Sequence, residues 1–429
     1  MRATRNNQTA RTIRLALREE FIELPLEVEV TEIPLFSPGN SSAPKRRKGR
    51  NQQAPKRRRM GDNNSKTKHH PKEAVMLFAG IDLHKRSLTV CVIDKKTGET
   101  FDQRFSCSEE SRILKFFKEL GTFQAVVEAS ATYDWLWELL EPYADRLVLA
   151  HPKKIRMIAE SMKKTDRNDA FFLAWLLSQD SVPEAHRPTP HQREYQLLVR
   201  TRHQVVERRT RNKNQIRAVL ANRNLDSKSL FSAKGREYLA GLKLRPAEQF
   251  RLEQLLESLD TLKEQLLATE HELAKFRSKA PRQEKKNHKI LRSVPGVGNV
   301  IADTVLCTMG DIRRFSTIRK ATGYSGLVPG VRQSDKKRKE LRITKEGPRI
   351  LRWALVEATW TAIRCSAYWR QQYERIAKRR GKKKAAVAIA RRMLGVMYTL
   401  LKHQTTYREA PAAVPGEQAE RMAAAARRA

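Results

Sequence analysis

The chain has 429 residues and carries 86 Lys and Arg against 47 Asp and Glu, which gives a formal net charge of +39. That length predicts two or three domains, because one compact core rarely organises so long a chain. No apolar run approaches the roughly 18 residues needed to cross a bilayer, and the N-terminal residues lack the apolar core of a secretion signal. The composition therefore excludes a membrane-spanning protein and favours a partner that is a polyanion, above all nucleic acid.

Residues 1–74 are predicted to form a basic, disordered arm. The runs KRRKGR at 45–50 and KRRR at 56–59 lie among Pro, Asn, Gln and Ser. Like charges at this density repel one another and leave little apolar surface to bury. Such an arm could contact phosphates, serve as a nuclear address, or result from a start codon placed too far upstream, and the sequence leaves these alternatives open.

Order is predicted to begin at residue 76, and residues 75–185 are expected to form an α/β domain. Two β-rich runs within 76–94, separated by HKRS, indicate a hairpin. Strands then alternate with helices, which is typical of a mixed sheet. The further elements expected are a strand at 100–107, a helix at 109–120, a strand at 123–130, a helix at 133–143, a strand at 146–152, and helical segments at 152–162 and 164–178.

Residues 186–285 are predicted to form long helices with a coiled-coil seam. In the second helix the apolar residues follow spacings of three and four that only Thr269 interrupts, which is a heptad pattern. The partner of this seam is either a helix of the same chain or a helix of a second subunit. The first helix is rich in Arg at 200–217, and its exposed side is interpreted as a nucleic-acid face. The seam consists of Leu252, Leu255, Leu259, Leu262, Leu266, Leu273 and Phe276.

Residues 286–402 are expected to form a mainly α-helical domain, followed by a tail at 403–429. Gly296 and Gly298, in the sequence PGVG between two helical runs, suggest a helix-hairpin-helix in which backbone N–H groups approach a DNA phosphate. An ordinary turn between helices is the alternative. Residues 323–347 are predicted to be a polar, glycine-rich loop that leads into a helix opened by Gly347 and Pro348.

Four carboxylates form the candidate metal site. Asp82 closes one strand, Glu128 ends another, and Asp166 and Asp169 are three residues apart and so share a helix face. Mg²⁺ prefers oxygen ligands, and a pair of ions about 3.5–4 Å apart stabilises both oxygens in phosphoryl transfer. The alternative is four ordinary surface acids.

The motifs AGIDLHK, VVEAS and KTDRNDA, in this order, resemble those of the Asp-Glu-Asp-Asp (DEDD) transposases with a RuvC-like, RNase H-type domain. The motifs SVPGVG, GYSGLVPGVRQS and TKEGPRILRWALVEA resemble the second domain of the same insertion-sequence recombinases, which a bridge RNA guides. The resemblance spans roughly residues 76–400. It implies an α/β RNase H-like (RuvC-like) domain, coiled-coil helices, and a mainly α C-terminal domain with a helix-hairpin-helix.

The resemblance also implies roles for individual residues. Asp82, Glu128, Asp166 and Asp169 would bind Mg²⁺, and Ser334 would be the nucleophile that forms a covalent phosphoserine link to DNA. Without the resemblance, Ser334 would be interpreted as a loop serine bonded to its own backbone. DNA contacts are expected from Gly296, Gly298, Arg332 and Lys336.

One position departs from the family pattern. The residue after the serine is usually Gly, whereas this chain has Asp335. A carboxylate beside the attacked phosphate is unfavourable, although Lys336 and the basic residues after it could offset its charge. The segment around Ser334 therefore differs in charge from the family pattern.

Partners implied by the resemblance are donor and target DNA, a guide RNA and further copies of the chain, as a dimer or tetramer. A cytoplasmic, nucleoid-associated protein is expected. The first alternative function is a RuvC-like, Mg²⁺-dependent nuclease that hydrolyses DNA without a covalent intermediate. The second is a nucleic-acid-binding protein with no enzymatic activity.

Structural rather than chemical roles are predicted for five further residues. Ser325, the rival serine, is predicted to be packed in the core. His84 is predicted to be a surface residue of the hairpin rather than a metal ligand. Trp135, Trp137 and Trp175 lie among leucines at helical positions and are predicted to be core rather than base-stacking residues.

Overall fold

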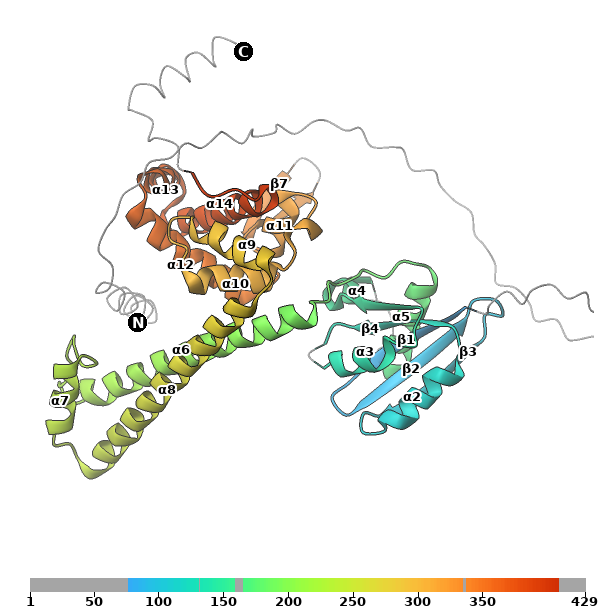
Figure 1. The fold of residues 1–429 in the computed structure, drawn as a ribbon, viewed down its shortest axis with the longest axis horizontal. Helices are drawn as coiled ribbons and strands as arrows, with labels where there is room; N and C mark the ends of the chain where they lie inside the picture. Colours follow the sequence, from blue (N-terminus) through green and yellow to red (C-terminus); the bar gives the residue numbers. More distant parts are fainter. Residues whose placement is uncertain (1–75, 131, 159–164, 335–336, 409–429) are drawn as a thin grey trace, which may run out of the picture. The chain divides into compact units, whose positions relative to one another are not determined.

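The computed structural model describes residues 76–130, 132–158, 165–334 and 337–408. The predicted N-terminal arm, the tail beyond 408, and Asp335 and Lys336 lie outside these ranges. The described chain divides after Pro188 into two compact units, 76–188 and 189–408, which we describe separately (Figure 1). The finer predicted division at 75–185, 186–285 and 286–402 stays a prediction.

The first unit is built on a five-stranded mixed sheet with the order β3-β2-β1-β4-β5. β1 pairs with β2, and β2 with β3, in antiparallel register, whereas β1, β4 and β5 run parallel. This confirms the predicted mixed sheet, and the strand order and directions are consistent with an RNase H-like domain. The strands are β1 (Leu77–Leu83), β2 (Ser87–Asp94), β3 (Thr100–Ser106), β4 (Phe123–Glu128) and β5 (Arg146–Ala150).

Alternation along the strands divides the apolar side chains between the two faces of the sheet. On one face, Ile81 and Val127 join a cluster completed by α2 (Glu110–Glu119) and α3 (Asp134–Leu140). On the other face, Phe78 and Val126 pack with residues of α4 (Pro152–Ile158) and α5 (Asp166–Ser178). Asp82 and Glu128 share the even-numbered positions of Phe78 and Val126, so they face the side that α5 covers.

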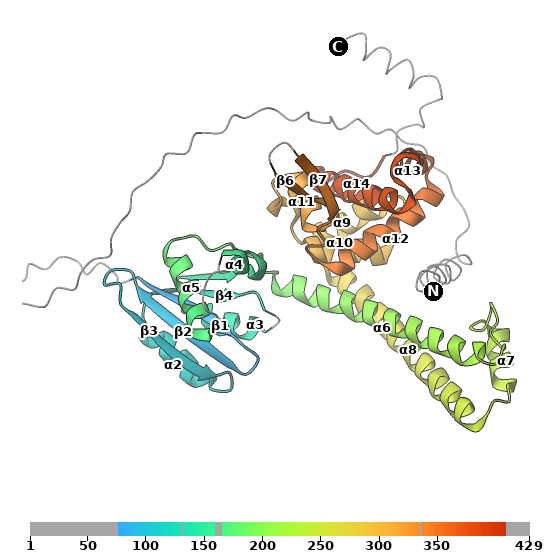
Figure 2. The ribbon, with the colours of Figure 1, turned by 180° about the vertical axis from the view of Figure 1, so that it is seen from behind.

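The second unit begins with two long helices, α6 (Pro190–Ala221) and α8 (Pro246–Lys279), joined through α7 (Ala233–Gly241). They run in opposite directions alongside each other (Figures 1 and 2). The leucines of the seam are buried, with Leu262 and Leu266 against Val205 of α6 in the same chain. This pairing favours the helical-hairpin alternative, and a regular coiled-coil geometry stays a prediction.

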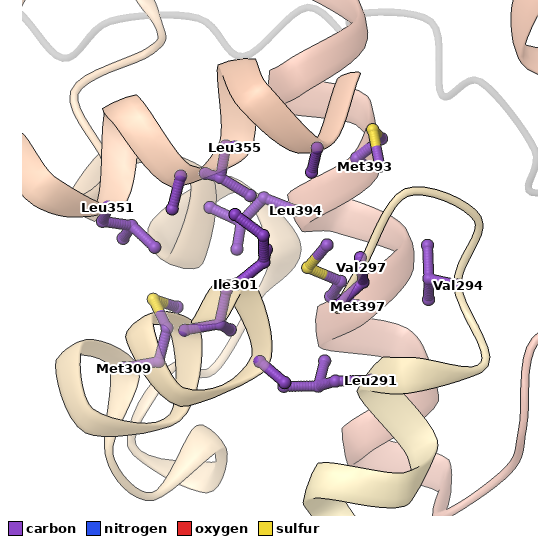
Figure 3. Close-up of a cluster of buried hydrophobic side chains, with 14 of the residues drawn as sticks. Leu291, Val294, Val297, Ile301, Met309, Leu351, Leu355, Met393, Leu394 and Met397 are labelled. Carbon is purple, nitrogen blue, oxygen red and sulfur yellow. The ribbon is translucent and has the colours of Figure 1, made fainter. Parts of the chain in front are cut away.

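The remaining helices of the second unit pack around one large core. α9 and α10 contribute Leu291 and Ile301, α12 contributes Leu355, and α14 contributes Met393 and Leu394, as Figure 3 shows. The helices are α9 (Arg282–Arg292), α10 (Asn299–Met309), the short 3-10 helix η1 (Ile312–Arg314), α11 (Ile318–Tyr324), α12 (Arg349–Cys365), α13 (Ala367–Arg380) and α14 (Lys382–His403).

A buried carboxylate joins the helix pair to this core. Asp303 of α10 accepts hydrogen bonds from the Tyr195 hydroxyl of α6 at 2.7 Å and from Arg277 of α8 at 2.6 Å. The ring nitrogen Nε2 of His288 in α9 lies 3.0 Å from the same carboxylate. Burial is the main cause that raises the pKa of Tyr195, and the neighbouring Asp303 adds to it. Residues of four helices therefore meet at one polar cluster. These partners stabilise the carboxylate of Asp303, because a buried charge is costly unless it is paired.

Residues 329–334 and 337–343 form two paired β-strands, so the prediction of a loop over 323–347 is wrong for these residues. β6 (Pro329–Ser334) pairs in antiparallel register with β7 (Lys337–Ile343). The segment lacks the alternation of apolar residues by which a strand is recognised, and its glycines and charges favoured a loop. Backbone pairing and the contacts at its base define the hairpin instead. Within the described ranges no helix is both long and apolar enough to cross a bilayer.

Candidate active site

Two strand ends bring the first two carboxylates together. β1 and β4 are parallel neighbours, and Ile81 is paired with Val127. Asp82 and Glu128 each follow a member of that pair, so they lie side by side at the carboxyl ends of the strands. Asp82 is buried, with 8% of its surface exposed, and Glu128 is half-buried.

The second two carboxylates come from the first turn of α5. Thr165 caps this helix, because its side-chain oxygen accepts a hydrogen bond from the Asn168 backbone N–H at 3.2 Å. Acidic residues are favoured in the first turn of a helix, where unpaired N–H groups create positive potential. Asp166 and Asp169 occupy this turn, and both are half-buried.

Gly80 sets the distance between α5 and the sheet. It lies two residues before Asp82 on the same face of β1, opposite Ala170 and Ala174 of α5. A Cβ at this position would overlap the backbone oxygen of Ala170 and the backbone nitrogen of Ala174. Only glycine allows α5 to pack so closely, and this close packing brings the helix-borne acids towards the strand-borne ones.

His84 completes the cluster. Its Nε2 atom lies 3.1 Å from Oδ2 of Asp82 and 3.4 Å from Oδ1 of Asp166. One ligand atom of each of these three residues lies within 4.8 Å of the others, a grouping that could hold a metal ion. His84 is half exposed, as expected for a hairpin residue, but its position in the cluster was missed. The spacing of two between Asp82 and His84 was the available signal, because alternate residues of an extended segment point to the same side.

The electrostatics of the cluster favour a bound cation. Burial is the main cause that raises the pKa of Asp82, His84 opposes it, and Asp166, Asp169 and Glu128 each raise the pKa further. The Oδ2 atom of Asp82 is buried and makes no hydrogen bond, since the 3.1 Å contact with His84 is an ion-pair distance without hydrogen-bond alignment. Crowded carboxylates with an unsatisfied oxygen fit a hard divalent ion.

Ser334 belongs to the second unit, where it is the last residue of β6. Its partner across the hairpin is Lys337, and Arg332 is paired with Lys339. The predicted contacts of Arg332 with DNA remain predictions, and Lys336 lies outside the described residues. The rival serine, Ser325, is fully buried and donates a hydrogen bond to the Thr322 carbonyl oxygen at 2.6 Å, which confirms its predicted packing.

The two glycines of the PGVG turn differ in surroundings. Gly296 has a φ of +82°, and a Cβ there would overlap the backbone oxygen of Ala358 in α12. Packing against α12 therefore accounts for this glycine without a phosphate. Gly298 caps α10, and nothing lies within 4 Å of a Cβ built on it. Of the two, only Gly298 has open space beside it, and the phosphate contact stays a prediction for both.

The tryptophan predictions have different outcomes. Trp137 is buried, as predicted, and donates a hydrogen bond to Glu141 at 3.1 Å. Trp135 is half-buried and packs against the sheet core. The prediction for Trp175 is wrong: 45% of its surface is exposed, although its ring stacks on Phe172. Leucines next to it in sequence are buried, but Trp175 lies on the outer side of α5.

A mixed sheet of this order, with carboxylates at the ends of β1 and β4 and on α5, is consistent with the RNase H-like enzymes that act on nucleic acids. Comparison with protein families agrees with this class. A model of DEDD transposases of the IS110 type, described as "Transposase", matches residues 79–223. A second model, described as "Transposase IS116/IS110/IS902 family", matches residues 288–374. The chain belongs to the DEDD-type IS110 transposase family, whose members are enzymes that cut and rejoin DNA.

Individual relatives extend over most of both chains. The transposase for insertion sequence element IS1111A of Coxiella burnetii is 26% identical over 344 residues, covering 77% of this chain and 90% of that protein. A probable family 20 transposase of Pseudomonas aeruginosa is 26% identical and covers 77% and 98%. A pilin gene-inverting protein of Moraxella bovis is 22% identical and covers 77% and 97%.

Proposed function

We propose that this transposase cuts DNA by attack of Ser334 and rejoins it from a covalent phosphoserine intermediate, with Mg²⁺ held by Asp82, Glu128, Asp166 and Asp169. The observation that carries the metal site is the cluster of Asp82 and Asp166 about His84. Glu128 and Asp169 are near enough to raise the pKa of Asp82, which supports assigning these two acids to the same site.

The proposed step conserves phosphate bonds. A bond forms between the serine oxygen and phosphorus, the bond from phosphorus to one strand breaks, and the serine proton is released as the leaving oxygen takes up a proton. Attack by another strand end reverses these changes, so resealing needs no ATP. Bound Mg²⁺ would neutralise charge on the scissile phosphate and favour the ionised attacking oxygen. The four acids would hold that ion and orient the phosphate against it.

The proposal requires two units to act together, because the acids belong to residues 76–188 and Ser334 belongs to 189–408. A homo-oligomer, either a dimer or a tetramer, could combine the acids of one chain with the serine of another. A mixture of two inactive variants tests this. We expect the Asp166→Asn and Ser334→Ala proteins each to be inactive, and restored activity on mixing would show a site shared between chains.

Nucleic-acid contacts are proposed for the basic surfaces of the second unit. Arg208 and Arg211 of α6 are exposed, whereas Arg202 of the same helix pairs with Glu270 at 2.6 Å. We assign the exposed arginines to a guide RNA. The region of Gly298, Arg332 and Lys336 is assigned to the DNA backbone, because such contacts position DNA without reading its sequence.

The test of the function is strand exchange by Ser334→Ala protein. We expect loss of strand exchange with DNA affinity within about threefold of wild type, because one hydroxyl contributes little to a surface dominated by Lys and Arg. Ser258→Ala, an exposed serine on α8, is the matched control and should remain active. Strand exchange by Ser334→Ala protein would refute the nucleophile. Cleavage by wild type without exchange or adduct would favour the metal-dependent nuclease.

A further inference from the structure

We infer that Arg352 is a positioning residue that fixes the direction of the β6–β7 hairpin, and hence the place of Ser334. This inference rests on the proposed role of Ser334. Arg352 lies in the first turn of α12, outside the hairpin and far from its tip in sequence. Its guanidinium donates hydrogen bonds to three backbone carbonyl oxygens.

The three oxygens lie on both sides of the hairpin. Nη1 of Arg352 lies 2.9 Å from the carbonyl oxygens of Glu346 and Gly347, which follow β7. The same atom lies 3.4 Å from the carbonyl oxygen of Ser325, which precedes β6. One cationic group therefore joins the entry and the exit of the hairpin to α12. Hydrogen bonds with a charged donor are among the stronger ones.

Two glycines bring these carbonyl groups together. Gly326 has a φ of +67° and Gly347 a φ of +77°, both in the region that favours glycine. A Cβ on Gly326 would overlap the backbone of Glu346, and a Cβ on Gly347 would overlap the backbone of Tyr324. The two chain segments thus cross in direct backbone contact, and the guanidinium of Arg352 lies at this crossing.

Backbone hydrogen bonds and apolar packing also hold the base of the hairpin. The Thr344 and Lys345 backbone N–H groups donate to the carbonyl oxygens of Val328 and Gly326 at 2.9 and 3.1 Å. Leu327 is buried and Ile343 packs beside the large core. A two-stranded hairpin alone is marginally stable in water, so these contacts at its base must define its direction.

A small tilt at the base of the hairpin produces a larger displacement of Ser334. A strand rises about 3.3 Å per residue, so Ser334 lies roughly 20 Å along β6 from Val328. A tilt of about 5° at the base would move the end of the strand by roughly 2 Å. Misplacing a reacting group by about 1 Å costs on the order of 100-fold in rate. Arg352 is therefore expected to affect the rate of attack while leaving DNA affinity unchanged.

The experiment compares full-length wild type with Arg352→Ala, Arg352→Lys and the control Arg364→Ala. Arg364 lies on the same helix and contacts Thr361 within it, so its removal changes the charge equally without touching the hairpin. Amide hydrogen exchange over 325–347 measures the hairpin base, and single-turnover formation of the DNA adduct measures attack. DNA affinity is measured in parallel.

For Arg352→Ala we expect exchange at Thr344 and Lys345 to become at least about tenfold faster, adduct formation to slow about 100-fold, and affinity to stay within about threefold. For Arg352→Lys, the rates of hydrogen exchange and of adduct formation should lie between those of Arg352→Ala and wild type, because an ammonium group can replace only part of the contacts of the guanidinium. Exchange equal to that of Arg364→Ala, or faster exchange with an unchanged rate, would overturn the inference. If wild type forms no adduct, the proposed function fails, and the exchange comparison still decides whether Arg352 holds the hairpin.

Discussion

The four carboxylates and the serine are supported by structures of different kinds. Asp82 and Glu128 end neighbouring strands inside a five-stranded sheet, and Asp166 and Asp169 begin a helix that packs directly on that sheet. Ser334 ends one strand of a separate two-stranded sheet, and the contacts described for this hairpin include those of Arg352 at its base. Packing of a helix on a sheet determines the acid cluster, whereas we infer that contacts at the hairpin base determine the direction of the serine. Substitutions should therefore act on the acid site through local chemistry and on the serine through geometry at a distance.

The largest effect is expected from Asp82→Asn. Loss of one ligand charge should lower DNA cleavage by on the order of 1,000-fold or more, because electrostatic stabilisation of the reacting phosphate is lost. Cleavage by the purified variant on a DNA substrate, over a range of Mg²⁺ concentrations, measures this. Activity within tenfold of wild type would show that Asp82 is not part of the metal site.

The raised pKa of Asp82 predicts how the stability of the metal-free protein depends on pH. The pKa of Asp82 is raised in the folded protein, so the folded state favours the protonated carboxyl. Its contribution to stability is therefore fully present below the ordinary pKa of about 3.8 and is lost as pH rises through the higher folded value. Asp82→Asn should flatten this fall in the free energy of unfolding as pH rises above about 4. A parallel pH profile in both proteins would contradict the assigned burial.

Gly80→Ala tests whether close packing of α5 sets the acid cluster. The added Cβ meets backbone atoms of α5, which cannot move aside as a side chain can. We expect a loss of about 1–3 kcal/mol in the free energy of unfolding and a fall of about 100-fold in cleavage. Gly241→Ala is the control, because Gly241 lies at the end of α7 and a Cβ built on it would have no neighbouring atom within 4 Å. Mn²⁺ affinity measured by electron paramagnetic resonance should fall only for Gly80→Ala, and equal affinities would refute the role of Gly80.

His84→Ala should have a smaller effect on the same site. The imidazole lies within ion-pair distance of Asp82 and Asp166, so its loss leaves both carboxylates less well oriented. Removing a partner that orients metal ligands typically costs 10- to 100-fold in metal affinity. Mn²⁺ titration of His84→Ala and of the control His271→Ala, an exposed histidine of α8, measures this. Unchanged affinity in His84→Ala would place the histidine outside the metal site.

The smallest functional effect is expected at the PGVG turn. Gly298→Ala should leave thermal stability nearly unchanged and weaken DNA binding a few-fold, if the N–H groups at the start of α10 contact phosphate. Gly296→Ala should instead lower the free energy of unfolding by about 1–3 kcal/mol, because the turn needs a positive φ and has no room for a Cβ. Equal stability losses in the two variants would contradict the distinction between a packing glycine and an open one.

Sequence patterns predicted the sheet, the helices and the location of the acids well, because each depends on local periodicity. The apolar runs of β1 and β4 end at Asp82 and Glu128, and the spacing of three places Asp166 and Asp169 on one helix turn. The contacts of His84 and Gly80 were missed, since they arise only when α5 packs on the sheet. The β6–β7 hairpin was predicted as a loop because its stability comes from backbone contacts at the base. The exposure of Trp175 was missed because periodicity among apolar residues did not reveal which side of α5 faces the sheet.

The most direct measurement is to trap the reaction on DNA, digest the protein and DNA, and locate the nucleotide-bearing peptide by mass spectrometry. The account predicts a phosphodiester on Ser334 that forms with Mg²⁺, is absent with a chelator, and is absent from the Asp166→Asn protein. Cleaved DNA with no modified peptide, a nucleotide on another residue, or an adduct formed equally well in the presence of chelator would contradict it.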